Sequence, residues 1–81
     1  MNTFTVTFYR ETGDQAEDVD IRAITVESPV EADDLATGDY DAHELVVARA
    51  RTQGSLDRLM GWESSHVTLT DGSVWEVPAG L

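Results

Sequence analysis

Two histidines are the side chains best suited to acid–base chemistry or metal binding near neutral pH. They are His43 and His66, 23 positions apart in the sequence. Asp39, Asp41 and His43 have the i, i+2, i+4 spacing with which a calcium-binding loop begins. The sixth position of such a loop requires glycine, but it is Glu44 here. The spacing therefore argues against a calcium loop, and we predict no metal site and no cofactor.

A serine beside a histidine is the second arrangement that could do chemistry. Ser64 and Ser65 precede His66, and Asp71 follows in the same segment. The three residue types of a Ser–His–acid triad are therefore present. No nucleophile elbow surrounds these serines, and the sequence holds no glycine-rich phosphate loop or dinucleotide fingerprint. The absence of cysteine excludes thiol nucleophiles and Cys-bound metals. We therefore predict that the protein is not an enzyme.

Acidic side chains dominate the composition. The 81 residues include 16 Asp and Glu against five arginines and no lysine, for a formal net charge of −11. Residues 11–44 carry twelve acids and one base, so their net charge of −11 equals that of the whole chain. One cluster contains Glu11, Asp14, Glu17, Asp18 and Asp20, and the other contains Glu27, Glu31, Asp33, Asp34, Asp39, Asp41 and Glu44. Carboxylates at this density must face solvent, because burial of unpaired charge is very costly.

We interpret this charge as the signature of a non-enzymatic interaction module that binds a basic protein surface. A sharper form of the hypothesis is an inhibitor of phage or mobile-element type, in which carboxylates stand in for nucleic-acid phosphates. The alternative is a soluble structural or assembly component, monomeric or homo-oligomeric, whose acidity serves only solubility or salt adaptation. The interaction hypothesis expects both clusters to gather on one face. The predicted partner-binding residues are Glu27, Glu31, Asp33, Asp34, Asp39, Asp41, Glu44 and Trp75.

The same charge disfavours two classes of partner. Direct binding to nucleic acid is not expected, since the surface would repel a phosphate backbone. Anionic membrane surfaces are disfavoured for the same reason. The longest aliphatic run, residues 45–48, is far shorter than the roughly 20 residues that a membrane-spanning helix needs. We therefore expect a soluble, cytoplasmic protein in which residues 1–81 form a single small acidic domain.

The first half of the chain predicts two strands followed by a helix. Residues 3–10 alternate apolar and polar side chains, which is typical of a half-buried strand. Residues 19–27 predict a second, antiparallel strand, and the shift in apolar phase after Ile21 predicts a bulge near Arg22-Ala23. The segment Ser28-Pro29-Val30-Glu31 has the signature of a capped helix start. Gly38 is placed to end this helix in a left-handed conformation.

Residues 41–53 fit two structures. Asp41 and Glu44 form a second capping-box signature, and the apolar residues that follow recur at helical spacing. The β-branched pair Val46-Val47 would equally suit a strand over residues 44–51. We favour the helix. Residues 55–60 are then expected to form one short turn before Gly61.

The end of the chain predicts a β-hairpin around Asp71-Gly72, whose residue types suit a two-residue type I′ turn. A two-residue turn pairs Leu69 with Val74 and Thr68 with Trp75. Val74 would then face the core, whereas Trp75 would lie on the other face. There Trp75 is either covered by a helix or by the loop that carries Trp62, and so part of the core, or exposed as an apolar anchor for a partner. The complete prediction is an α+β fold with a small antiparallel sheet, in the order strand, strand, one or two helices, strand, strand.

Overall fold

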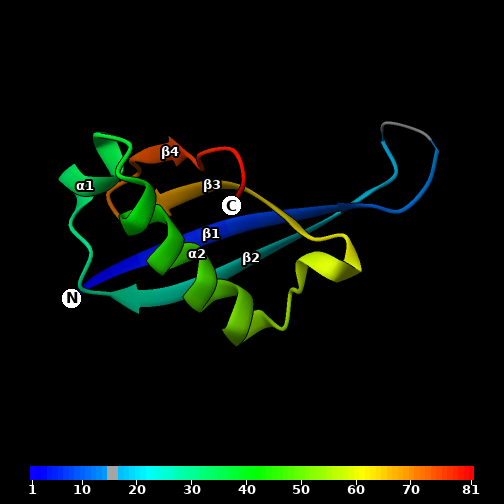
Figure 1. Ribbon diagram of the computed structural model, residues 1–81, viewed down its shortest axis with the longest axis horizontal. Helices are drawn as coiled ribbons and strands as arrows, with labels where there is room; N and C mark the ends of the chain where they lie inside the picture. Colours follow the sequence, from blue (N-terminus) through cyan, green and yellow to red (C-terminus); the bar gives the residue numbers. More distant parts are fainter. Residues whose placement is uncertain (15–16) are drawn as a thin grey trace.

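The computed structural model describes residues 1–14 and 17–81, which form four strands and two α-helices (Figure 1). Strands β1 (Asn2–Glu11) and β2 (Val19–Ser28) come first, followed by helices α1 (Ala32–Ala36) and α2 (Tyr40–Gly54). A 3₁₀ turn, η1 (Arg58–Met60), then leads to strands β3 (Glu63–Leu69) and β4 (Val74–Glu76). The predicted α+β class, with a small antiparallel sheet in this element order, is confirmed.

Strand β1 lies inside the sheet, whose order is β2-β1-β3-β4 with every neighbouring pair antiparallel. The pairing of β1 with β2 is unbroken over the whole length of both strands, so the predicted bulge near Arg22-Ala23 is wrong. The apolar phase shift has a simpler cause. Ile24 packs against the core, whereas Ile21 is on the opposite side of the sheet with 67% of its surface exposed.

The irregularity of the sheet lies between β1 and β3 instead. Thr7 pairs with His66, but the next residue, Phe8, pairs with Ser64. Ser65 is therefore the extra residue of a β-bulge in β3. Phe8 of β1 therefore continues to face the core, whereas the alternation of side chains along β3 shifts by one residue at Ser65.

The core lies between one face of the sheet and α2, which crosses that face (Figure 1). Strand β1 contributes three fully buried side chains, Phe4, Val6 and Phe8. Helix α2 contributes an apolar stripe that includes Val46 and Ala50 at a spacing of four, one helical turn. The helical prediction for residues 41–53 is therefore confirmed, because only a helix places this stripe against the strand.

The helix boundaries differ in part from the prediction. Ser28 ends β2 rather than capping a helix, and its Oγ accepts from the amide of Val30 (3.3 Å). Helix α1 starts after Glu31, whose side chain makes no capping hydrogen bond. Gly38 has the predicted positive φ, 79°. Helix α2 is capped by Asp39, since its Oδ1 accepts from the amides of two residues in the first turn (3.0 and 3.3 Å).

The C-terminal hairpin is present, but its register differs by one residue from the prediction. Thr68 pairs with Val74 and Val67 with Trp75, so the loop has three residues and Gly72 adopts a φ of 96°. A shift of one residue exchanges the two faces of a strand. Trp75 consequently packs half-buried against the core, whereas Val74 is 57% exposed on the uncovered face. The predicted orientations of both side chains are therefore wrong.

Candidate protein-interaction surface

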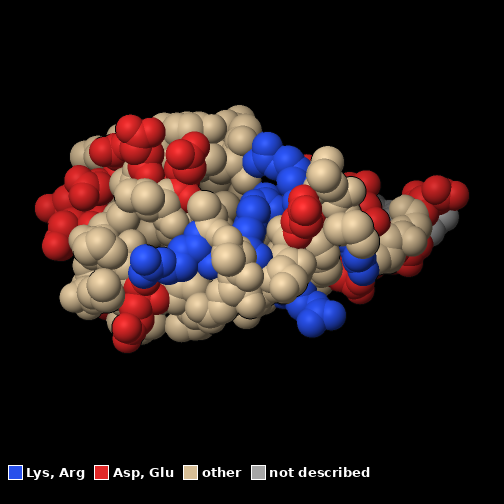
Figure 2. Space-filling view, turned by 60° about the horizontal axis from the view of Figure 1, so that its bottom comes forward, with Lys and Arg blue, Asp and Glu red and all other residues tan. Residues whose placement is uncertain are grey.

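The seven predicted acidic residues lie close together in the fold at one end of the molecule. They occupy the end of β2 (Glu27), helix α1 with its N-cap (Glu31, Asp33, Asp34), and the start of α2 (Asp39, Asp41, Glu44). All seven are exposed, and residues 27–44 contain no lysine or arginine. We call this group the acidic end. Figure 2 shows acidic side chains gathered at the end of the molecule that carries α1.

Some of these carboxylates stabilise the helices that carry them. Asp39 is the N-cap of α2, and Asp41 lies in the first turn of that helix. Asp33 and Asp34 lie in the first turn of α1. Negative charge is favourable at these positions because the amino end of a helix carries partial positive charge. Such residues need no partner to explain them, whereas the three glutamates make no side-chain hydrogen bond within the described residues.

Trp75 is not an exposed anchor beside this surface. Its pairing with Val67 places it on the side of the sheet that faces α2. An anchor residue of an interface needs to be free in the unbound protein, whereas this indole already contributes to the core. The acidic end therefore lacks the aromatic contact that the sequence suggested.

The other acidic cluster lies at the far end of the molecule. Glu11 ends β1, Asp20 lies near the start of β2, and Asp14, Glu17 and Asp18 lie between these strands, at the end of the long axis away from α1 (Figure 1). The principal extents of the molecule are 38 × 22 × 21 Å. In Figure 2 arginines occupy the region between the acidic end and this second group of carboxylates. The expectation that both clusters share one face is therefore wrong. The paired strands β1 and β2 carry the cluster around residues 11–20 away from the acidic end.

The arginines are used mainly to hold the backbone together. In the described residues the one salt bridge joins Arg10 to Asp20 (2.9 Å), and the Arg10 guanidinium also stacks over the Trp62 ring. Arg49 and Arg58 each donate to a backbone carbonyl, of Glu27 and Gly80 respectively. The carboxylates of the acidic end are thus not neutralised by ion pairing with these arginines.

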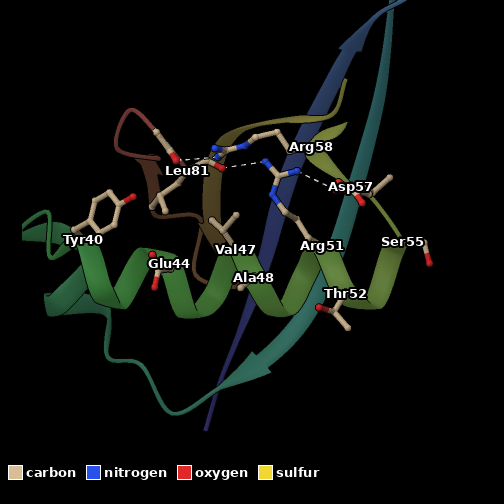
Figure 3. Close-up of a pocket in the computed structure, with 12 residues that line it drawn as sticks. Tyr40, Glu44, Val47, Ala48, Arg51, Thr52, Ser55, Asp57, Arg58 and Leu81 are labelled. Carbon is tan, nitrogen blue, oxygen red and sulfur yellow. Dashed lines mark hydrogen bonds between the residues drawn. The ribbon is translucent and has the colours of Figure 1, made fainter. Parts of the chain in front are cut away.

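Arg51 joins three segments at the wall of a groove of about 740 Å³ between α2 and the last residues of the chain (Figure 3). Its guanidinium donates to the carbonyl oxygens of Leu56, Trp62 and Leu81, each at 2.9 Å. Burial and the neighbouring charge of Arg58 lower the pKa of Arg51 below its ordinary value. Since most of its donors are already engaged, Arg51 is a structural residue of this groove.

The two histidines lie apart and in different settings. His43 is 1% exposed, and its Nε2 donates to the Leu35 carbonyl oxygen (3.1 Å), which ties α2 to α1. The Nδ1 atom of His43 has no hydrogen-bond partner among the residues that the structure describes. His66 lies on the uncovered face, with its Nδ1 3.1 Å from the Ser65 Oγ. Asp71 instead accepts from the Ser73 amide (2.8 Å), which lowers its pKa.

Within residues 1–14 and 17–81, no three His, Asp or Glu side chains are grouped closely enough to hold a metal ion. A buried His43 could have been anticipated from the sequence. It lies three residues before Val46, on the stripe that faces the core. A side chain in that position ties helices together rather than meeting a ligand.

Comparison with known proteins provides no assignment. No family model, no curated protein and no solved structure matches this chain. Among the helices in the described part of the chain, none has both the length and the apolar character needed to cross a membrane. Function must therefore be inferred from the surface of the molecule alone.

Proposed function

We propose that the protein is a non-enzymatic interaction module whose acidic end binds a basic protein surface. The observation that supports this proposal is the set of seven exposed carboxylates over α1, the start of α2 and the end of β2. None of them forms a salt bridge within the described residues. Their charge is therefore available to a partner, at the cost of mutual repulsion in the free protein.

A basic protein surface is the partner that this charge fits best. Complementary charges steer the encounter and fix the orientation of docking, and their range is about 8 Å at physiological ionic strength. A sharper form of the proposal is nucleic-acid mimicry, in which the basic surface is itself a nucleic-acid-binding site. In that case duplex DNA competes with the protein for its partner.

The proposal can be tested with poly-lysine as the basic probe and NMR as the readout. Titration of poly-lysine into isotopically labelled protein should shift the amide resonances of residues 27–44 first. Two triple variants then compare the two ends of the molecule. Glu31→Gln/Asp34→Asn/Glu44→Gln removes three charges from the acidic end, and Glu11→Gln/Asp14→Asn/Glu17→Gln removes three from the end of β1 and the residues that follow it.

The acidic-end variant should weaken binding about tenfold at low salt, since three exposed charge pairs at about 0.5 kcal/mol each lose about 1.5 kcal/mol. The Glu11→Gln/Asp14→Asn/Glu17→Gln variant is the matched control, because its net charge changes by the same amount. Its affinity for poly-lysine should fall less than about threefold. Equal losses in both variants would show that poly-lysine senses only net charge. That result would overturn the assignment of a binding surface to the acidic end.

A further inference from the structure

The outer edge of β2 presents backbone groups that the rest of the sheet does not use. Their direction follows from the pairing of β1 with its two neighbours. The Leu69 amide donates to the Ser73 carbonyl on the β4 side of β3 (2.9 Å), so Leu69 and its partner Phe4 do not exchange hydrogen bonds. Phe4 therefore directs its peptide groups toward its other partner, Val26 of β2. Val26 in turn directs its peptide groups toward β1. Because the peptide groups of successive residues point to opposite edges of a strand, the odd-numbered residues of β2 direct their N–H and C=O groups away from the sheet.

Helix α2 covers half of this edge. Gln53 Nε2 donates to the Thr25 carbonyl (2.8 Å), and Arg49 donates to the Glu27 carbonyl, both of which point outward. These two contacts block further strand pairing at that half. This role of Arg49 and Gln53 could not be anticipated from the sequence, because it depends on the helix lying along the strand edge.

In the described part of the structure, the other half of the edge, residues 19–23, is open except at the amide of Val19. The amide of Val19 donates locally to the Glu17 carbonyl (3.0 Å). No side chain in the described residues donates to the outward carbonyls of Ile21 and Ala23, and both residues are exposed. An exposed edge of this kind is a template for an additional strand.

The charges along the open edge indicate which strand fits. Asp20 and Arg22 flank Ile21, so the segment carries opposite charges on either side of a central apolar residue. When two such segments pair antiparallel, the numbers of the two residues that face each other add up to the same value along the pair. When Ile21 faces Ile21 of a second copy, Asp20 of each copy faces Arg22 of the other.

We propose that two copies of this chain associate through the open β2 edges, antiparallel and centred on Ile21, to give a continuous eight-stranded sheet. The exposed side chains of Ile21 meet on the uncovered face, and Val19 of each copy faces Ala23 of the other. Asp20 and Arg22 occupy the closer, non-hydrogen-bonded pairs, where opposite charges interact best.

The neighbouring registers are disfavoured by the same charges. A shift by two residues in one direction places Asp20 opposite Asp20, and a shift in the other direction places Arg22 opposite Arg22. The blocked carbonyls of Thr25 and Glu27 further limit pairing to residues 19–23. The structure therefore offers one favourable alignment.

Asp20 can take part without losing its existing contact. Arg10 donates to Oδ2 of Asp20, and the Asp20 side chain is 49% exposed. Its second oxygen can accept from Arg22 of the second copy, which would extend the Arg10–Asp20 bridge across the new strand pair. An interface built on five paired residues is small, so association should be weak and depend on protein concentration.

Charge exchange between copies provides the test, with sedimentation velocity at increasing concentration as the readout. Arg22→Glu places a glutamate opposite Asp20 of the second copy, and Asp20→Arg places an arginine opposite Arg22. Each variant alone should therefore dimerise at least about tenfold more weakly than the unmodified chain. A mixture of the two variants pairs opposite charges again and should recover the dimer. Recovery in the mixture identifies contact between two copies of this edge.

A backbone variant tests the pairing independently of charge. Ala23→Pro removes an amide that points away from the sheet, so the fold should persist while the dimer is lost. Ala23→Ser keeps the amide and is the control. An unmodified chain that stays monomeric at millimolar concentration, or variants that dimerise as it does, would overturn the proposal. All these positions lie outside the acidic end, so the outcome does not bear on binding of a basic partner.

Discussion

Replacement of Arg51 by methionine should destabilise the protein more than any other loss of one arginine. Arg51 donates three hydrogen bonds to backbone carbonyls, of Leu56, Trp62 and Leu81. These bonds join α2 to the segments before and after the last two strands. Methionine preserves much of the aliphatic stem. It provides no donor and also removes the guanidinium that lies over the Phe8 ring (5.1 Å).

The magnitude follows from the three bonds. A hydrogen bond from a charged donor contributes about 1.5–3 kcal/mol when buried, but Arg51 is half-exposed and water can replace part of each contact. About 1 kcal/mol per bond gives a loss of about 3 kcal/mol. A chain of this length is expected to unfold with only about 4–12 kcal/mol, so the variant should lose about 12–24 °C in Tm.

Urea unfolding followed by circular dichroism measures this loss. Arg58→Met is the matched control, because it removes the same charge but only one hydrogen bond, from an exposed side chain to the Gly80 carbonyl. It should cost less than about 1 kcal/mol. Arg51→Lys keeps the charge without the planar fork and should lose most of the stability as well. Equal losses at Arg51 and Arg58, or full stability in Arg51→Lys, would refute the reasoning.

Three further outcomes are expected. Asp39→Ala should destabilise the protein by about 1 kcal/mol in urea unfolding, whereas Asp39→Asn should cost little, because asparagine can also cap α2. Gly72→Ala should lower the unfolding midpoint by an amount that corresponds to about 1 kcal/mol, since φ is 96° at that position; an unchanged midpoint would contradict the strain. The Ser73 amide lowers the pKa of Asp71 below its ordinary value of 3.8, so the carboxylate stabilises the fold above that value and the contribution disappears as pH falls through the lowered pKa. Asp71→Ala should therefore destabilise the protein near pH 7 but much less near pH 2, and a pH-independent difference would contradict this linkage.

Local patterns in the sequence predicted the elements well. The alternation around Phe4, Val6 and Phe8 identified β1, and helical spacing around Val46 correctly favoured a helix over a strand. These predictions succeeded because each depends on one periodic face meeting one core. Gly38 was likewise anticipated, since a left-handed residue after a helix favours glycine.

The hairpin register could not be predicted because Asp71-Gly72 suits two loops. A two-residue turn and a three-residue loop with Gly72 in a left-handed conformation both place glycine well. The loop length decides the face of every residue that follows, and the structure has the longer loop. Trp75 was therefore assigned to the wrong face by a difference of one residue.

The site was predicted less completely than the fold. The sequence identified which carboxylates are exposed, because dense charge cannot be buried. It did not show that the first cluster lies at the tip of a projecting hairpin, away from the second (Figure 1). The open edge of β2 could not be predicted from the sequence either, since the outward direction of its peptide groups depends on pairing between distant strands.

The inner position of β1 affects how the chain folds during synthesis. β1 can pair with β2 as soon as both have left the ribosome, but its other edge must wait for β3, more than fifty residues later. Closing a loop of that length is costly and slows the final pairing step. Until then the chain presents Phe4, Val6 and Phe8 on a strand with one side still unpaired. Nascent chains halted before residue 63 should therefore be the form most prone to aggregate.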